Sequence, residues 1–165
     1  VRSNVSLFKV FLGIIVLVPP VIALMQIRQE SSLWLFYCLS IIWVADIGAY
    51  FSGKRFGKNK LALQLSPGKT REGLYGAVFA TTLYSYLASI VFELQFIETL
   101  MLLIIAVLTT FISVAGDLFF SLLKREQNLK DTGRILPGHG GILDRIDSVT
   151  SSAPLLALLL GLVIF

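Results

Sequence analysis

Residues 117–147 read DLFFSLLKREQNLKDTGRILPGHGGILDRID, and this stretch decides how the rest of the chain is interpreted. It holds four aspartates, five cationic side chains and the only histidine, yet an apolar run leads into it and another leads out. Such a contrast predicts two membrane helices joined by a polar loop at one face of a bilayer.

Both helix ends carry polar side chains at helical spacing. Two groups each share a helix face: Asp117, Ser121 and Lys124 before the loop, and Asp144, Asp147 and Ser151 in a second helix that begins near Ile142. Like-charged carboxylates near a bilayer repel one another and resist desolvation, whereas a divalent cation that prefers oxygen ligands removes both costs. We therefore predict a Mg²⁺ site, with the option of a second metal ion, held by Asp117, Asp144 and Asp147.

The loop between these helices supplies groups that bind phosphate. Its cations are Lys124, Arg125, Lys130, Arg134 and Arg145. Gly138, Gly140 and Gly141 lack the Cβ atoms that would keep backbone N–H groups away from phosphate oxygens, and a helix starting at Gly141 would also attract an anion. His139 could act as a general base, donate to a phosphate or make a structural hydrogen bond. Together these groups predict a pyrophosphate site.

The same stretch resembles a long family signature. The matching residues are Ser121, Lys124-Arg125, Lys130-Asp131, Gly133, Leu136-Pro137, His139-Gly140-Gly141, Asp144-Arg145 and Asp147. Their types and spacing are similar to those of the bacterial phosphatidate cytidylyltransferases, or CDP-diacylglycerol synthases. The resemblance implies an enzyme of phospholipid biosynthesis that transfers the cytidylyl group of CTP to phosphatidic acid and releases pyrophosphate. It also suggests a homodimer in the bacterial inner membrane.

Composition places the chain in a membrane. Hydrophobic residues make up 56% of the 165, charged residues 15%, and the mean hydropathy is +0.83, far from a soluble domain. Five segments could each cross a hydrocarbon core, which takes about 20 residues. They are Leu7–Met25, Leu33–Phe51, Leu74–Phe92, Leu100–Leu123 and Ser148–Phe165. We predict an all-α, polytopic transmembrane helix bundle that forms one membrane-embedded catalytic domain over residues 1–165.

Details of the spans add three expectations. Pro19 and Pro20 predict a kink or break in the first span. Trp34 and Trp43 are expected at lipid-facing or interfacial positions. The chain starts at Val1 rather than methionine, and similar proteins carry further hydrophobic helices ahead of this part, so we expect the carboxyl-terminal part of a longer chain.

The distribution of Lys and Arg predicts the orientation. The amino-terminal flank has two, residues 26–32 one, 52–73 six, 93–99 none and 124–147 five. Alternate connections are therefore basic, which places both long loops on the cytoplasmic side together with the site. Nucleic acid is a poor partner, because no aromatic platform lies among these cations outside the spans.

The other long loop, residues 52–73, reads SGKRFGKNKLALQLSPGKTREG. Its cations could serve only as a topological anchor. However, Ser66–Thr70 is expected to form a compact turn whose hydroxyls and Lys69 ammonium clamp a phosphate, and the same region extends the family resemblance back to Asp46. The Gly-Lys-Thr triplet is not a nucleotide-binding P-loop, because Leu63 stands where that motif needs glycine. Asp46 could join the site or pair with a Lys or Arg of its own loop.

On this hypothesis the candidate residues form two groups. The catalytic group is Asp117, Lys124, Asp144 and Asp147. The substrate-binding group is Ser66, Lys69, Thr70, Ser121, Arg125, Lys130, Arg134, His139, Gly140, Gly141 and Arg145. The alternatives are a CTP-dependent membrane lipid kinase, which would transfer the γ-phosphoryl group, and a transporter or non-catalytic fragment. Transporters usually carry their charges near the bilayer midplane, whereas most charges here lie in two loops.

Overall fold

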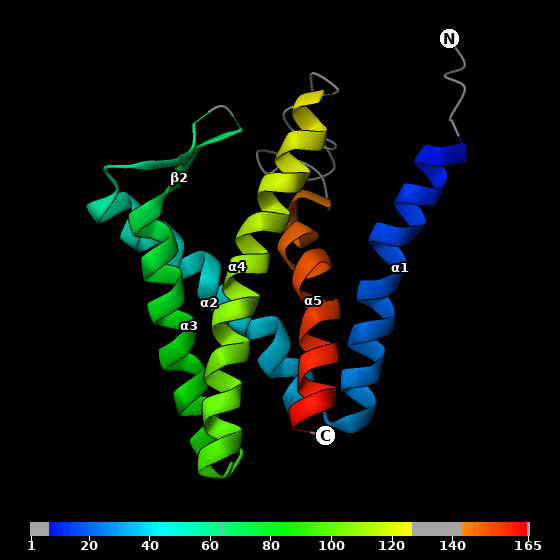
Figure 1. The fold of residues 1–165 in the computed structure, drawn as a ribbon, viewed down its shortest axis with the longest axis vertical. Coiled ribbons are helices and arrows are strands. Elements are labelled where there is room, and N and C mark those ends of the chain that lie inside the picture. The colour runs from blue at the N-terminus through cyan, green and yellow to red at the C-terminus, as the bar shows by residue number, and fades with distance from the viewer. Residues whose placement is uncertain (1–6, 64, 127–142, 165) are drawn as a thin grey trace.

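The computed structural model describes residues 7–63, 65–126 and 143–164, without the side chains of residues 8–10, 12 and 143–145. Within these ranges the chain forms five helices and one two-stranded hairpin (Figure 1). The helices are α1 (Leu7–Glu30), α2 (Ser32–Phe56), α3 (Arg71–Val91), α4 (Phe96–Glu126) and α5 (Leu143–Val163). The strands β1 (Lys60–Ala62) and β2 (Ser66–Thr70) pair antiparallel between α2 and α3.

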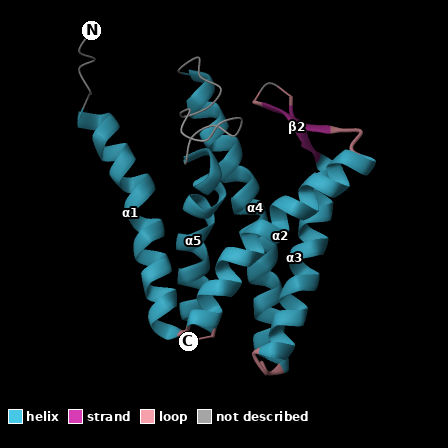
Figure 2. Cartoon of the chain, turned by 180° about the vertical axis from the view of Figure 1, so that it is seen from behind, coloured by secondary structure: helices cyan, strands magenta, loops and turns pink. Residues whose placement is uncertain are grey.

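All five helices are long and apolar enough to cross a membrane. Large apolar side chains such as Phe79, Leu158 and Leu162 are 60–73% exposed on their outer faces, as expected of surfaces that contact lipid. The helices alternate in direction, and the hairpin lies at the end of the bundle opposite the carboxyl terminus (Figures 1 and 2). The predicted all-α membrane bundle with five spans is therefore confirmed, and the chain is an integral membrane protein.

Two expectations for the spans can be compared with the structure. Of the kink or break expected at Pro19 and Pro20, the break is absent, because helix α1 continues through both prolines, in keeping with the tolerance of membrane helices for proline. Trp34 was expected at a lipid-facing or interfacial position, but it is buried, stacked on Phe92 with ring centroids 4.2 Å apart. Trp43 is 57% exposed, as expected. Aromatic stacking on Phe92, the residue that follows α3, explains why Trp34 points inward.

Small and hydroxylated residues let the helices approach closely. A Cβ added at Gly48 of α2 would lie 2.8 Å from the Ala80 Cβ of α3. Buried hydroxyls pair across the same helices, since the Tyr37 and Ser85 oxygens lie 2.7 Å apart. Thr81 of α3 and Thr110 of α4 make a similar contact of 2.8 Å. In lipid, such packing and interhelical hydrogen bonds replace the hydrophobic effect as the force between helices.

The Tyr37–Ser85 contact provides a test of this packing. Combining Tyr37→Phe with Ser85→Ala in a double-mutant cycle should give a coupling energy of about 0.6 kcal/mol, the typical value for an interhelical hydrogen bond in a membrane. The measurement is reversible unfolding in mixed micelles, with the exposed Tyr86→Phe as the control. A coupling energy of zero would mean that the two hydroxyls do not bond.

Candidate active site

The hairpin, the last turns of α2 and α4 and the first turns of α3 and α5 lie toward the same end of the bundle (Figure 1). Helices α2 and α4 end there with basic residues in their last turns, Lys54 and Arg55 on α2 and Lys124 and Arg125 on α4. Cations at helix carboxyl ends are favourable because the helix dipole is negative there. Helices α3 and α5 begin at the same end, so the positive ends of their dipoles lie there as well. This end of the bundle is therefore suited to anions.

The hairpin corrects one prediction. Ser66–Thr70 was expected to form a compact turn, but it is strand β2, with Ser66 paired to Ala62 and Thr70 to Lys60. The start of the hairpin is also tied to α3, because the Asn59 side chain, just before β1, donates to the Glu72 carboxylate at 2.8 Å. The strand separates the residues that were expected to converge. Ser66 stands at the far end of β2 and is not among the residues lining the cavity that contains Lys69 and Thr70.

Thr70 has a structural role that the sequence prediction missed. It is the N-cap of α3, where its Oγ1 accepts a hydrogen bond from the Gly73 N–H at 3.1 Å, and it is 6% exposed. It also packs against the end of α2, because a Cβ added at Gly53 would lie 3.0 Å from its Oγ1. Thr70 thus fixes the junction of β2, α3 and α2, and Lys69 beside it is held in place.

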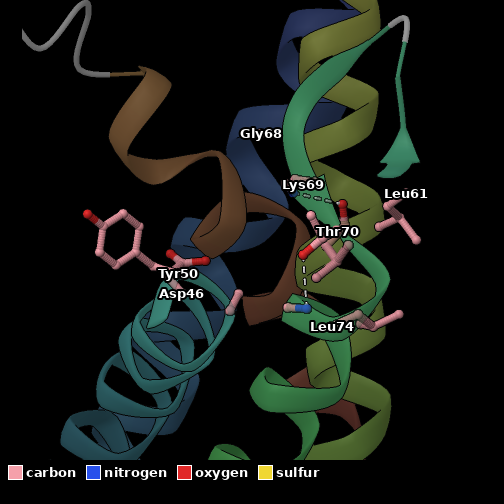
Figure 3. Close-up of a pocket in the computed structure, with 10 residues that line it drawn as sticks. Asp46, Tyr50, Leu61, Gly68, Lys69, Thr70 and Leu74 are labelled. Carbon is pink, nitrogen blue, oxygen red and sulfur yellow. Dashed lines mark hydrogen bonds between the residues drawn. The ribbon is translucent and has the colours of Figure 1, made fainter. Parts of the chain in front are cut away.

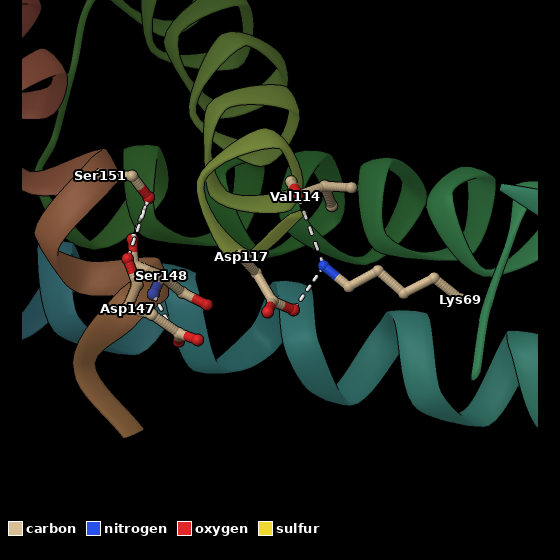
Figure 4. A network of polar contacts seen from close by, with 6 residues as sticks. All are labelled: Lys69, Val114, Asp117, Asp147, Ser148 and Ser151. Carbon is tan, nitrogen blue, oxygen red and sulfur yellow. Dashed lines mark hydrogen bonds and ion pairs between the residues drawn. The ribbon is translucent and has the colours of Figure 1, made fainter. Parts of the chain in front are cut away.

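Lys69 forms an ion pair with Asp117 of α4 and also donates to the Val114 carbonyl oxygen at 3.4 Å (Figure 4). Both side chains are partly exposed, 23% for Lys69 and 30% for Asp117. This ion pair connects the two regions of the family resemblance, because Lys69 belongs to the one at residues 66–70 and Asp117 begins the stretch that contains the other. The sequence predicted that Lys69 binds a phosphate and that Asp117 is a metal ligand. The structure places the two side chains in contact.

Two more carboxylates stand near this ion pair. Asp147 of α5 is 7% exposed and accepts a hydrogen bond from the Ser148 N–H at 2.8 Å. Asp46 of α2 lines a cavity of about 130 Å³ together with Lys69 and Thr70 (Figure 3). Asp117 repels both carboxylates electrostatically and Lys69 attracts both. Asp117 is therefore paired with Lys69, and the carboxylates of two further helices lie within electrostatic range of this pair.

Asp46 is the addition that the structure makes to the predicted site. From the sequence, Asp46 could either belong to the site or form an ion pair with a Lys or Arg of its own loop. Among the described residues the ion pair of Lys69 is made with Asp117, and none is made with Asp46. Its position in the cavity favours a role in the site. The sequence feature that could have indicated this role is the position of Asp46, one turn before Tyr50 and close to the end of a predicted span.

Of the remaining predicted residues, some have described side chains and others do not. Ser121 and Lys124 continue the face of α4 that carries Asp117, and Lys124 attracts Asp147 electrostatically. Arg125 is exposed. Lys130, Arg134, His139, Gly140 and Gly141 lie outside the described residues. Asp144 and Arg145 belong to the first turn of α5, but their side chains are not described.

The predicted metal ligands are therefore only partly placed. Asp117 and Asp147 interact with each other, whereas the third ligand, Asp144, has no described side chain. Among the side chains that are described, no three acidic, histidine or cysteine residues form a group that could hold a metal ion.

The chain is a member of the cytidylyltransferase family, whose model matches residues 2–163. A phosphatidate cytidylyltransferase of Pseudomonas aeruginosa is 41% identical over 151 residues, which cover 90% of this chain and 56% of that protein. Proteins of the same name from Haemophilus influenzae and Rickettsia felis are 36% and 38% identical, and the alignments cover 57% and 70% of their lengths. The chain thus spans just over half the length of the Pseudomonas and Haemophilus relatives.

The N-cap role of Thr70 is open to a direct test. Thr70→Val should destabilise the protein by about 1 kcal/mol, the usual cost of losing a cap, and speed hydrogen exchange at the Gly73 amide. Thr70→Ser keeps the oxygen and should restore most of the protection. Equal exchange rates in Thr70→Val and the parent protein would rule out the cap.

Proposed function

We propose that this chain carries the active site of an enzyme that transfers the cytidylyl group of CTP to phosphatidic acid, forming CDP-diacylglycerol and pyrophosphate. The proposal rests on one observation above others: Lys69 is paired with Asp117, and both act electrostatically on Asp46 and Asp147 of two other membrane helices. Membership of the cytidylyltransferase family and the names of its relatives support the choice of substrates.

The reaction is a displacement at phosphorus. An oxygen of the phosphatidic acid phosphate attacks the α-phosphorus of CTP in line with the bond to the bridging oxygen of the β-phosphate. The new oxygen–phosphorus bond forms as that bridging bond breaks, and pyrophosphate leaves with its electron pair. Both substrates are anions, so the groups at the site have to orient them and offset their charge.

The chain's own cations suit that task. Lys69 and Lys124 both attract the Asp147 carboxylate. We assign them to phosphate oxygens of the two substrates, together with Arg125 at the end of α4. The loop residues Lys130, Arg134, His139, Gly140, Gly141 and Arg145 are proposed as further phosphate ligands. Ser121, one turn beyond Asp117, is proposed as a hydrogen-bond donor to the same oxygens.

The acids suit a magnesium ion. Mg²⁺ is usually bound by one or two carboxylates together with substrate phosphates, so a full cage of protein ligands is not needed. Asp117 and Asp147 already interact across α4 and α5, and Asp144 lies one helical turn before Asp147. We propose these three as the ligands, with Asp46 within electrostatic range of Asp117 and Asp147. When bound, the ion would neutralise charge on the phosphates that react and leave.

The position of the site suits a lipid substrate. The acids lie in helices with exposed apolar sides, in the half of the bundle where α2 and α4 end, so a lipid could present its phosphate while its chains remain in the bilayer. The excess of Lys and Arg at this end favours the cytoplasmic face of a bacterial inner membrane. A homodimer remains part of the proposal on the basis of resemblance alone.

One assay tests the proposed reaction. Purified protein in mixed micelles receives phosphatidic acid, Mg²⁺ and CTP labelled at either the α- or the γ-phosphorus. Label from the α-position should enter the lipid, and label from the γ-position should not. Transfer of the γ-label would identify a lipid kinase, and no transfer of either label would contradict an active enzyme in this chain.

The buried carboxylate of α5 provides a matched variant. Asp147→Asn keeps the shape but removes the charge, and α-label transfer should fall by about 100-fold or more, because charge stabilisation at such sites is worth that much. Glu30→Gln at the opposite end of the bundle is the control and should keep full activity. Unchanged transfer by Asp147→Asn would remove this residue from the site.

A further inference from the structure

Helices α4 and α5 make a very close contact directly beside Asp117 and Asp147. A Cβ added at Gly116 would overlap the Oγ and Cβ atoms of Ser151, and even the Ser151 Cα would be only 3.7 Å away. Gly116 is buried and directly precedes Asp117. Ser151 follows Asp147 by one helical turn. The contact therefore lies at the level of the two carboxylates.

The side chain of Ser151 is held in the position that needs a glycine opposite. Its Oγ lies 3.1 Å from the Asp147 carbonyl oxygen and 3.0 Å from the Ser148 carbonyl oxygen, both within its own helix (Figure 4). Rotating the hydroxyl away from α4 would break these hydrogen bonds, and the Ser151 Cβ would still block an added methyl group. An extra carbon at residue 116 therefore has to push the helices apart.

The separation of these helices sets the separation of the two carboxylates. Asp117 and Asp147 repel each other, which acts against a close approach of α4 and α5, while the attraction of Lys69 and Lys124 for Asp147 offsets part of this repulsion. Small residues at a membrane helix interface allow the backbones to approach and gain dispersion energy, which opposes that repulsion. The Gly116–Ser151 contact lies beside the two carboxylates, so its dispersion energy opposes their repulsion at the place where the repulsion acts.

We propose that Gly116 and Ser151 are positioning residues: their contact holds α4 and α5 at the distance at which Asp117 and Asp147 act together on the reacting phosphates. The effect on catalysis rests on the proposed cytidylyl transfer, whereas the effect on helix separation does not. Neither residue touches substrate in this proposal. Both act through the aspartates beside them.

The chain offers a matched control in the same helix. A Cβ added at Gly161 of α5 would meet nothing within 4 Å, so Gly161→Ala adds the same methyl group without a clash. Gly116→Ala should lower kcat for α-label transfer on the order of 100-fold, because small misplacements of reacting groups have such effects, with little change in KM for CTP. Gly161→Ala should match the parent protein.

Rescue separates positioning from a general packing defect. Removing the opposing side chain in Gly116→Ala/Ser151→Gly makes room for the methyl group and should return kcat to within about tenfold of the parent value, a coupling expected of residues in contact. Ser151→Thr enlarges the contact from the other side and should lower kcat like Gly116→Ala. It also serves as the test variant should Gly116→Ala fail to fold.

Helix separation is measured without reference to activity. Spin labels at the exposed positions Leu108 of α4 and Leu158 of α5, with the buried Cys38 replaced by alanine, report the distance between the helices by pulsed electron paramagnetic resonance. The distance should increase in Gly116→Ala and Ser151→Thr and return in the double variant. The Gly161→Ala control should keep the parent distance.

The outcomes separate the two proposals. A parent protein that transfers no label would contradict the proposed function, and the spin-label distances would still test the contact. An unchanged distance in both Gly116→Ala and Ser151→Thr would overturn the positioning role. An active parent and a folded Gly116→Ala whose loss of kcat is not rescued by Ser151→Gly would overturn it as well.

Discussion

The repulsion among Asp46, Asp117 and Asp147 is the constraint around which the described end of the bundle is built. Acidic side chains at the edge of a hydrocarbon core are costly, and three of them from three helices would disperse unless other forces held them. Lys69 supplies one such force through its ion pair with Asp117. Close helix contacts supply another, because they set the positions of the backbones that carry the acids.

The scaffold and the site are therefore one arrangement. Thr70 caps α3 and packs against α2, which fixes the hairpin strand that carries Lys69. Gly116 lets α5 come close to α4, which brings Asp147 toward Asp117. An acidic group held in this way is suited to cations and, through them, to phosphates. The proposed reaction between two anionic substrates requires that combination at a membrane surface.

Several features could be predicted from the sequence because they depend on local patterns. The apolar runs located five spans, and the helical spacing placed Asp117, Ser121 and Lys124 on one face of α4. The strand at residues 66–70 was missed, because a short polar segment with proline and glycine carries turn signals whether or not a partner strand is present. The inward position of Trp34 depends on stacking with Phe92, which follows α3 and is far from Trp34 in the sequence. The pairing of Lys69 with Asp117 and the place of Asp46 likewise depend on which helices become neighbours, which no single segment encodes.

The proposed role of the two central carboxylates is that Asp117 of α4 and Asp147 of α5 hold a cation where two phosphates meet. Anomalous scattering from crystals of the protein grown with CTP and Mn²⁺ in place of Mg²⁺ tests it most directly. The account predicts a manganese peak within coordination distance of Asp117 and Asp147, bridged to the nucleotide phosphates. Bound nucleotide with no peak beside these carboxylates, or with a peak elsewhere on the bundle, would contradict it.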